Sequence, residues 1–308
     1  MSHDPLSFGL GEIPEERLRL VGASGRPWLE QLPGVVAECV ARWSLTLHAG
    51  FSDLSYNYAA PGVRADGSAI VLKVCYPDAD FRNELAALQL FAGRGVVRLL
   101  KADASRGAML LERLVPGMPL SAVGDAERQA NIAASVMRKL WRPAPPGQIL
   151  PSVATWIDHM ADAAPKLLPG SAMAPALVER ALSLYSRLSA TASEPVLLHG
   201  DLHQGNILSA QREAWLAIDP KGVTGPAIWE TGPLLLNLLA QPADTAANRQ
   251  RLDQFVARLA EELGFSEWEI RAWGVVRAVL ASFWSLEDSG TAWHGAQTLA
   301  DLLDRPGH

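Results

Sequence analysis

The sequence has little of what marks secreted, membrane-spanning or nucleic-acid-binding proteins. Its 308 residues include two cysteines, Cys39 and Cys75, which lie among apolar neighbours and form no CxxC pair. Isolated cysteines of this kind favour structural thiols in a reducing compartment. The amino-terminal segment lacks both the basic region and the apolar core of a signal peptide.

Long hydrophobic runs and an excess of basic residues are also missing. The longest apolar run, residues 234–240, is interrupted by Asn237 and falls far short of the ~20 residues that span a membrane. The formal charge is −6, which disfavours a nucleic-acid partner. We therefore expect a cytoplasmic monomer or homodimer that binds neither membrane nor nucleic acid. Its acidity either serves solubility or suits a cationic small substrate.

What the chain does contain is a globular composition, with 49% hydrophobic and 19% charged residues. Residues 13–43 predict short helices with a turn, around Pro27 and Pro33. Alternating apolar residues then predict strands over residues 43–60, and AIVLKVC (69–75) is typical of a buried strand. A helical period begins at Phe81, and two further strands are predicted within residues 96–114.

Beyond Pro116-Gly117 the pattern changes to long Ala- and Leu-rich helical stretches. These stretches cover residues 125–141, 153–168, 174–191, 247–263 and 266–288. Short strands are predicted only where VLLH, NILS and WLAID occur, between residues 196 and 219. The sequence thus predicts an α+β protein with a small β-rich lobe, residues 1–114, and a larger, mainly helical lobe, residues 115–308.

Acids, amides and imidazoles interrupt the apolar segment 197–222. His199 and His203 are four residues apart, as in helical zinc sites. The glutamate that such a site needs after the first histidine is replaced by Gly200, and Gly205 disfavours a continuous helix. A zinc site is therefore disfavoured.

The spacing of Asp201, Asn206 and Asp219 fits phosphoryl transfer better. This reaction demands positioning and cations that neutralise phosphate oxygens. Magnesium prefers hard oxygen ligands, which the amide of Asn206 and the carboxylate of Asp219 supply. Asp201 would orient the attacking hydroxyl and accept its proton.

These motifs resemble a known family. HGDLHQGN (199–206) is similar to the H-G-D-x-x-x-x-N loop of aminoglycoside phosphotransferases, relatives of the protein kinases, and AIDPKG (217–222) stands where protein kinases have D-F-G. LSYNYAAPG, VLKV, NELAALQLF, VRLL, LLERLVPG and WLAIDPKG, in this order, resemble the branch of streptomycin 6-phosphotransferases and hydroxyurea-resistance kinases. The resemblance covers residues 43–237. It implies a two-lobed protein-kinase-like fold that uses ATP and Mg²⁺.

The resemblance also implies roles in the first lobe. Lys73 would contact the α- and β-phosphates of the nucleotide, and Glu84 would pair with Lys73 and hold it. The segment from Glu112 to Leu114 would form the hinge, near residues 112–116, whose backbone reads the adenine edge. HAGFSDLSYNY contains a single glycine, so backbone amides and a hydroxyl such as that of Ser52 or Ser55 would cover the phosphates.

The acceptor is expected to bind in the helical lobe. Glu230, beside Trp229, could bind a cationic acceptor or cap the following helix. His203 is a candidate neighbour of the acceptor hydroxyl, with a structural hydrogen bond as its alternative, and His199 is expected to support the loop. Lys221 could contact phosphate or solvent. Further acids could form an acidic rim: Asp158, Asp162, Glu287 and Asp288.

Each nucleotide and metal role has a structural alternative. Lys73 could extend to solvent and Glu84 could be a surface residue. Glu112 could be a surface charge on an edge strand, and Asp201 and Asp219 could form turns.

We predict an ATP- and Mg²⁺-dependent small-molecule kinase whose acceptor is a streptomycin-type aminoglycoside, phosphorylated at its 6-hydroxyl. Hydroxyurea is the nearest alternative acceptor. A metabolic kinase of the same fold that acts on a housekeeping alcohol is another. A nucleotide-binding module without catalysis is a further alternative, against which the intact set of Lys73, Asp201, Asn206 and Asp219 argues.

Overall fold

The computed structural model describes residues 22–51, 57–144, 147, 150–239 and 242–304. The chain divides into two compact units, residues 1–115 and 116–308. The sequence predicts a boundary after residue 114, and the roles predicted for the two parts stay predictions.

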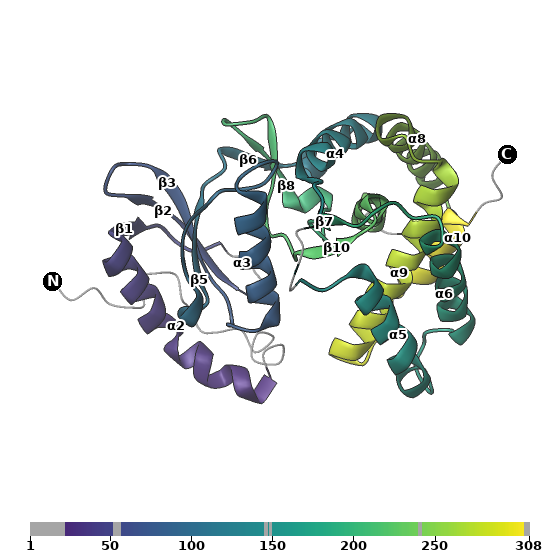
Figure 1. Ribbon diagram of the computed structural model, residues 1–308, viewed down its shortest axis with the longest axis horizontal. Coiled ribbons are helices and arrows are strands. Elements are labelled where there is room, and N and C mark those ends of the chain that lie inside the picture. Colours follow the sequence, from purple (N-terminus) through teal and green to yellow (C-terminus); the bar gives the residue numbers. More distant parts are fainter. Residues whose placement is uncertain (1–21, 52–56, 145–146, 148–149, 240–241, 305–308) are drawn as a thin grey trace. The chain divides into compact units, whose positions relative to one another are not determined.

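An antiparallel sheet forms the centre of the first unit (Figure 1). Among the described residues, five strands pair in the order β1-β2-β3-β5-β4. In the central strand β3, Lys73 lies opposite Ala59 of β2 and Met109 of β5, which explains why its sequence is apolar apart from this lysine. The elements of the unit are β1 (Leu45–Leu47), β2 (Tyr58–Arg64), β3 (Ala69–Val74), β4 (Leu99–Asp103), β5 (Ala108–Glu112), α2 (Gly22–Trp43), α3 (Ala79–Phe91) and the 3₁₀-helix η2 (Ala104–Arg106).

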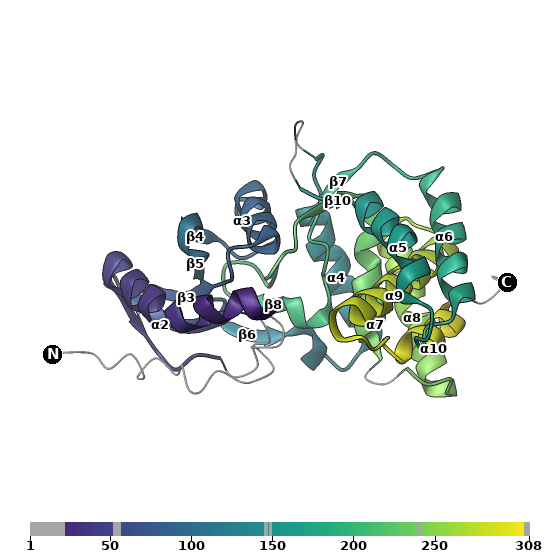
Figure 2. The same cartoon turned by 90° about the horizontal axis from the view of Figure 1, so that it is seen from below.

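Helices α2 and α3 cover opposite faces of this sheet (Figure 2). Side chains alternate along a strand, so Ile70 and Leu72 point away from the face that carries Lys73. Ile70 and Leu72 share a core with residues of α2. On the other face, Glu84 of α3 reaches Lys73. The alternation of β3 thus separates an apolar core from a buried charge.

The prediction of short helices around Pro27 and Pro33 is wrong, because α2 is a single helix that contains both prolines. Leu32, Val36 and Cys39 recur at helical spacing and are buried in the core of the first unit. Burial of this stripe against the sheet outweighs the backbone hydrogen bonds that the prolines remove.

In the first unit, we expect Gly107→Ala to lower the free energy of unfolding by roughly 3 kcal/mol. Gly107 has a φ of +66°, and a Cβ there would lie 2.1 Å from the carbonyl oxygen of Cys75. Gly67 is the matched control, because it has a φ of +79° but no atom within 4 Å of an added Cβ. Gly67→Ala should therefore cost only about 1 kcal/mol. Denaturant unfolding measures both variants, and equal losses would contradict the role of the contact with Cys75.

The second unit contains short strands between its helices. Strands β6 (Pro116–Pro119), β8 (Ile207–Ala210) and β9 (Trp215–Ala217) form an antiparallel sheet in the order β6-β8-β9. Strand β7 (Val196–Leu198) pairs with β10 (Val223–Gly225). The three strands predicted between residues 196 and 219 are confirmed.

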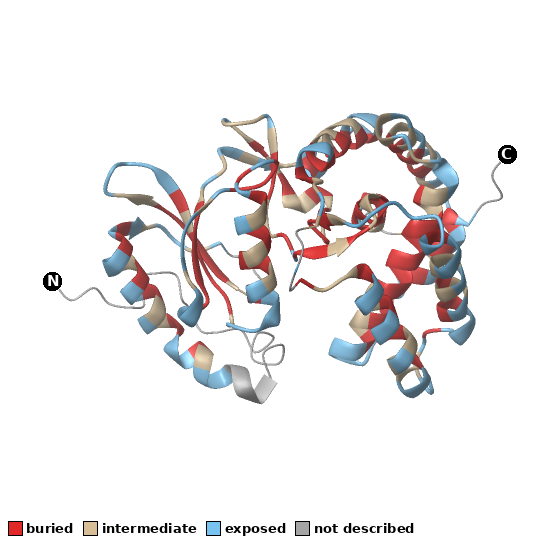
Figure 3. Cartoon of the chain, viewed as in Figure 1, coloured by how far each residue is buried: buried red, intermediate tan, exposed pale blue. Residues whose placement is uncertain are grey.

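The predicted helical stretches of the second unit are confirmed to within a few residues. Helix α9 lies among α5, α6, α7, α8 and α10, and most of its length is buried (Figure 3). None of the described helices combines the length and hydropathy needed to cross a membrane. The helices are α4 (Ala126–Leu140), α5 (Val153–Leu167), α6 (Pro175–Ser189), α7 (Thr231–Leu238), α8 (Ala246–Leu263), α9 (Glu267–Ser289) and α10 (Gly295–Leu303), with the 3₁₀-helices η3 (Leu120–Ala122), η4 (Gln204–Asn206) and η5 (Ala227–Glu230).

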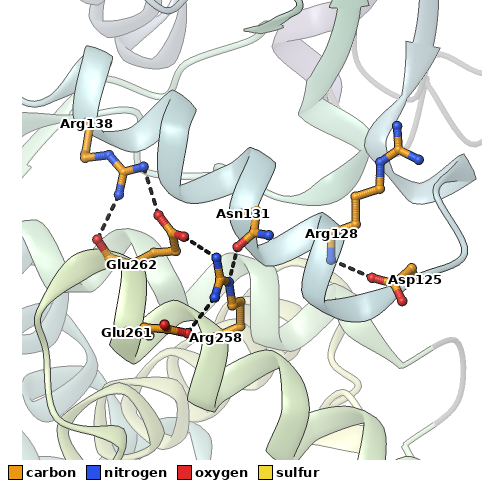
Figure 4. Close-up of polar contacts among 7 residues, drawn as sticks. All are labelled: Asp125, Arg128, Asn131, Arg138, Arg258, Glu261 and Glu262. Atoms are coloured by element: carbon orange, nitrogen blue, oxygen red, sulfur yellow. Dashed lines mark hydrogen bonds and ion pairs between the residues drawn. The ribbon is translucent and has the colours of Figure 1, made fainter.

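A polar network joins α4 to α8 (Figure 4). Arg258 of α8 contacts Asn131 of α4 and pairs with Glu261 and Glu262 of its own helix, at 2.5 and 2.6 Å. Arg138 of α4 donates to the carbonyl and the carboxylate of Glu262, at 2.8 and 3.1 Å. Such partly exposed pairs contribute at most about 1 kcal/mol each. The packing of α4 on α8 therefore rests mainly on their apolar faces.

Candidate active site

A buried ion pair lies in the first unit. Lys73 Nζ is 2.6 Å from Glu84 Oε1, and the two side chains are only 7% and 10% exposed. Strand β3 positions Lys73, and α3 positions Glu84 from a start capped by Asp78, whose carboxylate accepts the N–H of Phe81. The expected pairing is present, so neither the solvent-directed lysine nor the surface glutamate of the structural alternatives describes these residues. Their role toward a nucleotide stays a prediction.

The contacts of the other residues predicted to bind nucleotide do not test that role. Glu112 ends β5, and its carboxylate accepts the N–H of Arg98 at 2.9 Å. Leu114 follows the strand and is half-buried. Ser52, like Ser55, lies outside the described residues. The hinge therefore stays a prediction.

In the second unit, His199 organises the loop that precedes η4. Its Nδ1 accepts the N–H of Asp201 at 3.3 Å, so the ring proton resides on Nε2, which donates to the carbonyl of Ile218 at 2.7 Å. Burial lowers the pKa of His199 to about 4, which keeps the ring neutral near pH 7. The predicted supporting role of His199 is confirmed.

Glu230 holds the same loop through its backbone. The side chain is fully buried, and its two oxygens accept the N–H groups of His199 and Gly200 at 2.7 and 2.8 Å. Burial raises the pKa of Glu230 to about 7, although these two hydrogen bonds lower it in part. The predicted roles of Glu230 need correction: a side chain without exposed surface does not meet an acceptor, and it makes no capping hydrogen bond to α7.

Trp229 needs the same correction. Its side chain is fully buried and packs against Trp156 and Trp273, with ring centroids 6.3 and 5.6 Å apart. It therefore belongs to the core behind the loop and does not face an acceptor. A large aromatic residue beside a buried acid is as well explained by packing as by binding, and the sequence offers no signal that separates the two.

Asp201 is the partly exposed acid of this loop, with a side chain that is 27% exposed. Its Oδ1 lies 3.4 Å from Nη2 of Arg277. Burial by itself raises the pKa of Asp201, but the positive charges of Arg277 and Lys221, with the two nearby histidines, outweigh it and hold the pKa below its usual value. Asp201 is thus an ionised carboxylate within reach of solvent, as a proton acceptor must be.

The hairpin of β8 and β9 brings Asn206 and Asp219 to one end. Asn206 precedes β8, Asp219 follows two residues after β9, and Ile218 donates to the carbonyl of Asn206 at 2.9 Å. The side-chain amide nitrogen of Asn206 donates to the carbonyl of Asp201 at 3.0 Å, which leaves the amide oxygen for a metal. Asp219 has a φ of +57°, a conformation that is uncommon for residues other than glycine and occurs at functional sites.

These oxygens fit a hard cation. An amide oxygen and a carboxylate suit Mg²⁺, with water and phosphate oxygens to complete its octahedral shell. Among the residues that the structure describes, no group of three or more His, Cys, Asp and Glu side chains could hold a metal ion.

His203 lies in the same loop and is half-buried. Its Nδ1 accepts the N–H of Gly205 at 3.0 Å, which is the structural hydrogen bond that the sequence allowed as an alternative. Burial lowers the pKa of His203. A contact between its ring and an acceptor stays a prediction.

Gly200 explains how the loop packs so closely. Its φ is +86°, and an added Cβ would lie 2.7 Å from Val223 Cγ1 and 3.5 Å from the ring of Trp156. The same glycine whose presence argues against zinc is thus required by the fold of this loop.

Arg277 is the residue of this site that the sequence analysis misses. It lies on α9, far along the chain from the loop, and its side chain is 5% exposed. The one available signal is a single arginine within the apolar run VVRAVLASFW (275–284), which carries no motif.

Comparison with known proteins identifies the family. Residues 45–289 match the family described as aminoglycoside/hydroxyurea antibiotic resistance kinase. The chain belongs to this family. It is 31% identical to a streptomycin 6-kinase of Streptomyces griseus, over 96% of each chain. It is 36% identical to a hydroxyurea phosphotransferase of Kitasatospora aureofaciens, over 91% of this chain and 81% of the other.

A solved structure supports the fold. Amicoumacin kinase hAmiN in complex with AMP-PNP, Ca²⁺ and Ami is similar to this chain with a TM-score of 0.61 at 14% identity, over 91% of this chain and 95% of the other. The predicted kinase-like fold and the resemblance to the streptomycin and hydroxyurea branch are confirmed. The protein is a small-molecule kinase.

The buried carboxylate of Glu230 should make the stability of this kinase depend on pH. Its pKa rises from an ordinary 4.5 to about 7 on folding, so its stabilising proton is fully bound below pH 4.5 and is lost as the pH rises through 7. At about 1.4 kcal/mol per pKa unit, the unfolding free energy of the wild type relative to Glu230→Gln should fall by roughly 3 kcal/mol between pH 4.5 and 8.

Denaturant unfolding across this pH range measures the difference between the two proteins. His199, whose lowered pKa acts in the opposite direction, is present in both and cancels. Glu179→Gln, on the exposed side of α6, is the control and should keep the pH dependence of the wild type. The same slope in Glu230→Gln and the wild type would contradict the expected titration.

Proposed function

We propose that this kinase transfers the γ-phosphoryl group of ATP, with Mg²⁺, to a hydroxyl group of a small molecule. The observation that carries the proposal is the segment from Asp201 to Asp219, which contains the loop before η4 and the hairpin of β8 and β9. It combines an ionised, partly exposed carboxylate with two oxygen donors that suit a metal. Phosphoryl transfer requires little covalent chemistry from a protein beyond such positioning.

Five residues of the second unit have distinct tasks in this reaction. The carboxylate of Asp201 accepts a hydrogen bond from the acceptor hydroxyl, orients it and takes its proton as the new phosphate ester forms. Asn206 and Asp219 hold the metal, which when bound neutralises charge on the phosphate oxygens. His199 and Glu230 keep the backbone of the loop in place.

The first unit contains a cationic side chain, Lys73, that suits nucleotide phosphates. Lys73 contacts the α- and β-phosphates, and Glu84 keeps its ammonium group in place at 2.6 Å. The nucleotide bound by amicoumacin kinase hAmiN, AMP-PNP, supports an adenine nucleotide as the donor. Cys39 and Cys75 are buried thiols, which is consistent with a cytoplasmic enzyme.

The proposed acceptor is an aminoglycoside of the streptomycin type, phosphorylated at its 6-hydroxyl. Its support is the streptomycin 6-kinase that covers 96% of this chain. With Glu230 buried, the exposed acids Asp158, Asp162, Glu287 and Asp288 are the candidates for attracting a cationic acceptor. Hydroxyurea is the second candidate, because the hydroxyurea phosphotransferase has the higher identity, 36%.

A panel of acceptors tests the function. The purified kinase is incubated with radiolabelled ATP, Mg²⁺ and, in turn, streptomycin, two other aminoglycosides, hydroxyurea and an amino alcohol. We expect label on streptomycin, at a position that mass spectrometry assigns to the 6-hydroxyl. Label on hydroxyurea alone would select the second candidate. Transfer to none of them above the ATP hydrolysis background would refute the proposed acceptors.

Two substitutions separate chemistry from metal binding. Asp201→Asn should lower kcat by about 1,000-fold, because the proton acceptor is lost, while the Kd for MgATP stays within about threefold. Asp219→Asn should weaken binding of MgATP by about tenfold and leave binding of metal-free ATP unchanged. Calorimetric titration with and without Mg²⁺ measures binding, and each variant is the control for the other. Turnover retained by Asp201→Asn, or an unchanged metal titration for Asp219→Asn, would sink the corresponding role.

A further inference from the structure

A buried arginine lies beside the proposed proton acceptor. Arg277 is 4% exposed and belongs to a stretch of α9 whose neighbouring side chains, including Val276 and Ala278, are buried and apolar. Removing a cation from water is costly unless its surroundings compensate for the loss of hydration. An apolar side chain at this position would pack at a lower cost, so the charge needs an explanation.

The contacts of Arg277 are unusual for a structural arginine. Nη2 meets Asp201 Oδ1 at 3.4 Å, and the guanidinium lies over the ring of Trp284, 5.0 Å from its centroid. Within the part of the chain that the structure describes, Nε and Nη1 are buried and have no hydrogen-bond partner. Among the described residues, the hydrogen bond of Arg277 is therefore with the carboxylate of the active-site loop.

The position of Arg277 is set by tight packing. A Cβ added to Gly232 of α7 would lie 2.7 Å from Arg277 Cβ, so α7 and α9 approach closely along the stem of the arginine. The ring of Trp284 packs against the guanidinium and restricts its movement. A planar group held at its stem and its face can fix the group that it contacts.

The exposed fractions of Asp201 and Arg277 show which of the two side chains a ligand would contact. The side chain of Asp201 is 27% exposed and that of Arg277 is 5% exposed. A ligand that enters from solvent therefore meets the carboxylate and not the guanidinium. The direct contact through which Arg277 can act on the reaction is therefore the one with Asp201.

We propose that Arg277 is a positioning residue that holds the Asp201 carboxylate by Oδ1 and presents Oδ2 to the acceptor hydroxyl. A carboxylate without such a contact could rotate about its side-chain bonds, and small misplacement of a reacting group is costly to the rate. The proposal rests on the proposed function, because it takes Asp201 to be the proton acceptor.

Crystal structures provide a test that does not depend on the acceptor. In Arg277→Met, we expect the Asp201 carboxylate to leave its wild-type position or to occupy several rotamers. The N–H groups of His199 and Gly200 should stay on Glu230. Arg271→Met is the matched control on the same helix, since Arg271 pairs with Asp253 at 2.7 Å and should leave Asp201 unchanged. An Asp201 that keeps its single wild-type position in Arg277→Met overturns the proposal.

Kinetics provide the second test, with ATP hydrolysis as the assay so that the acceptor need not be known. Arg277→Met should lower kcat by about 100-fold with the Kd for MgATP unchanged, and Arg277→Lys should fall between Met and wild type. In the Asp201→Asn background, Arg277→Met should have no further effect, because both substitutions remove the same function. Multiplicative losses in the double variant would show that Arg277 acts independently of Asp201, and they would overturn the proposal.

The outcomes separate this proposal from the function itself. If no acceptor in the panel is phosphorylated, the proposed acceptors fail while the position of Asp201 still decides the role of Arg277. If Arg277→Met does not fold, Arg277→Gln replaces it with the same expectations, because glutamine removes the charge and keeps a polar but shorter side chain. A melting temperature equal to that of Arg271→Met, together with the loss of kcat, excludes a merely structural effect.

Discussion

Two hydrogen bonds to one buried carboxylate hold the active-site loop of this kinase. The backbone N–H groups of His199 and Gly200 both end on Glu230, and His199 in turn binds the loop to Ile218 through its ring. A buried acid is costly unless its oxygens are satisfied, and the loop satisfies both of them. Asp201, which follows directly, therefore begins from a fixed backbone.

The charges around this loop compensate one another. Asp201 is partly exposed and Glu230 is fully buried, and Arg277 interacts electrostatically with both. The pKa of Asp201 is lowered and that of Glu230 is raised, so the two acids differ in their readiness to ionise although they share a neighbour. At Asp201 burial is outweighed by nearby positive charges, which favour the charged form, and at Glu230 burial favours the neutral form. The loop thus carries an acid that favours its ionised form, and the buried acid that holds the loop favours its neutral form.

Much of the fold and part of the site could be predicted because the signals are local. A short apolar run marks β3 and helical periodicity marks α3, and both depend on side chains within one element. Helix α2 was predicted incorrectly, because the sheet that stabilises it comes later in the sequence. Glu230 and Trp229 were correctly singled out as unusual residues, but their burial, which decides what they do, depends on packing that no spacing reveals.

The sequence by itself determined the order and spacing of Asp201, Asn206 and Asp219, because a loop and a hairpin bring together residues that are close in the chain. Tertiary structure alone decided what surrounds them. Glu230 is 30 residues from Gly200 and Arg277 is 76 residues from Asp201, and each arrives on a different element. Their contacts follow from how η5 and α9 pack on the loop, and packing is a property of whole buried faces that short motifs do not encode.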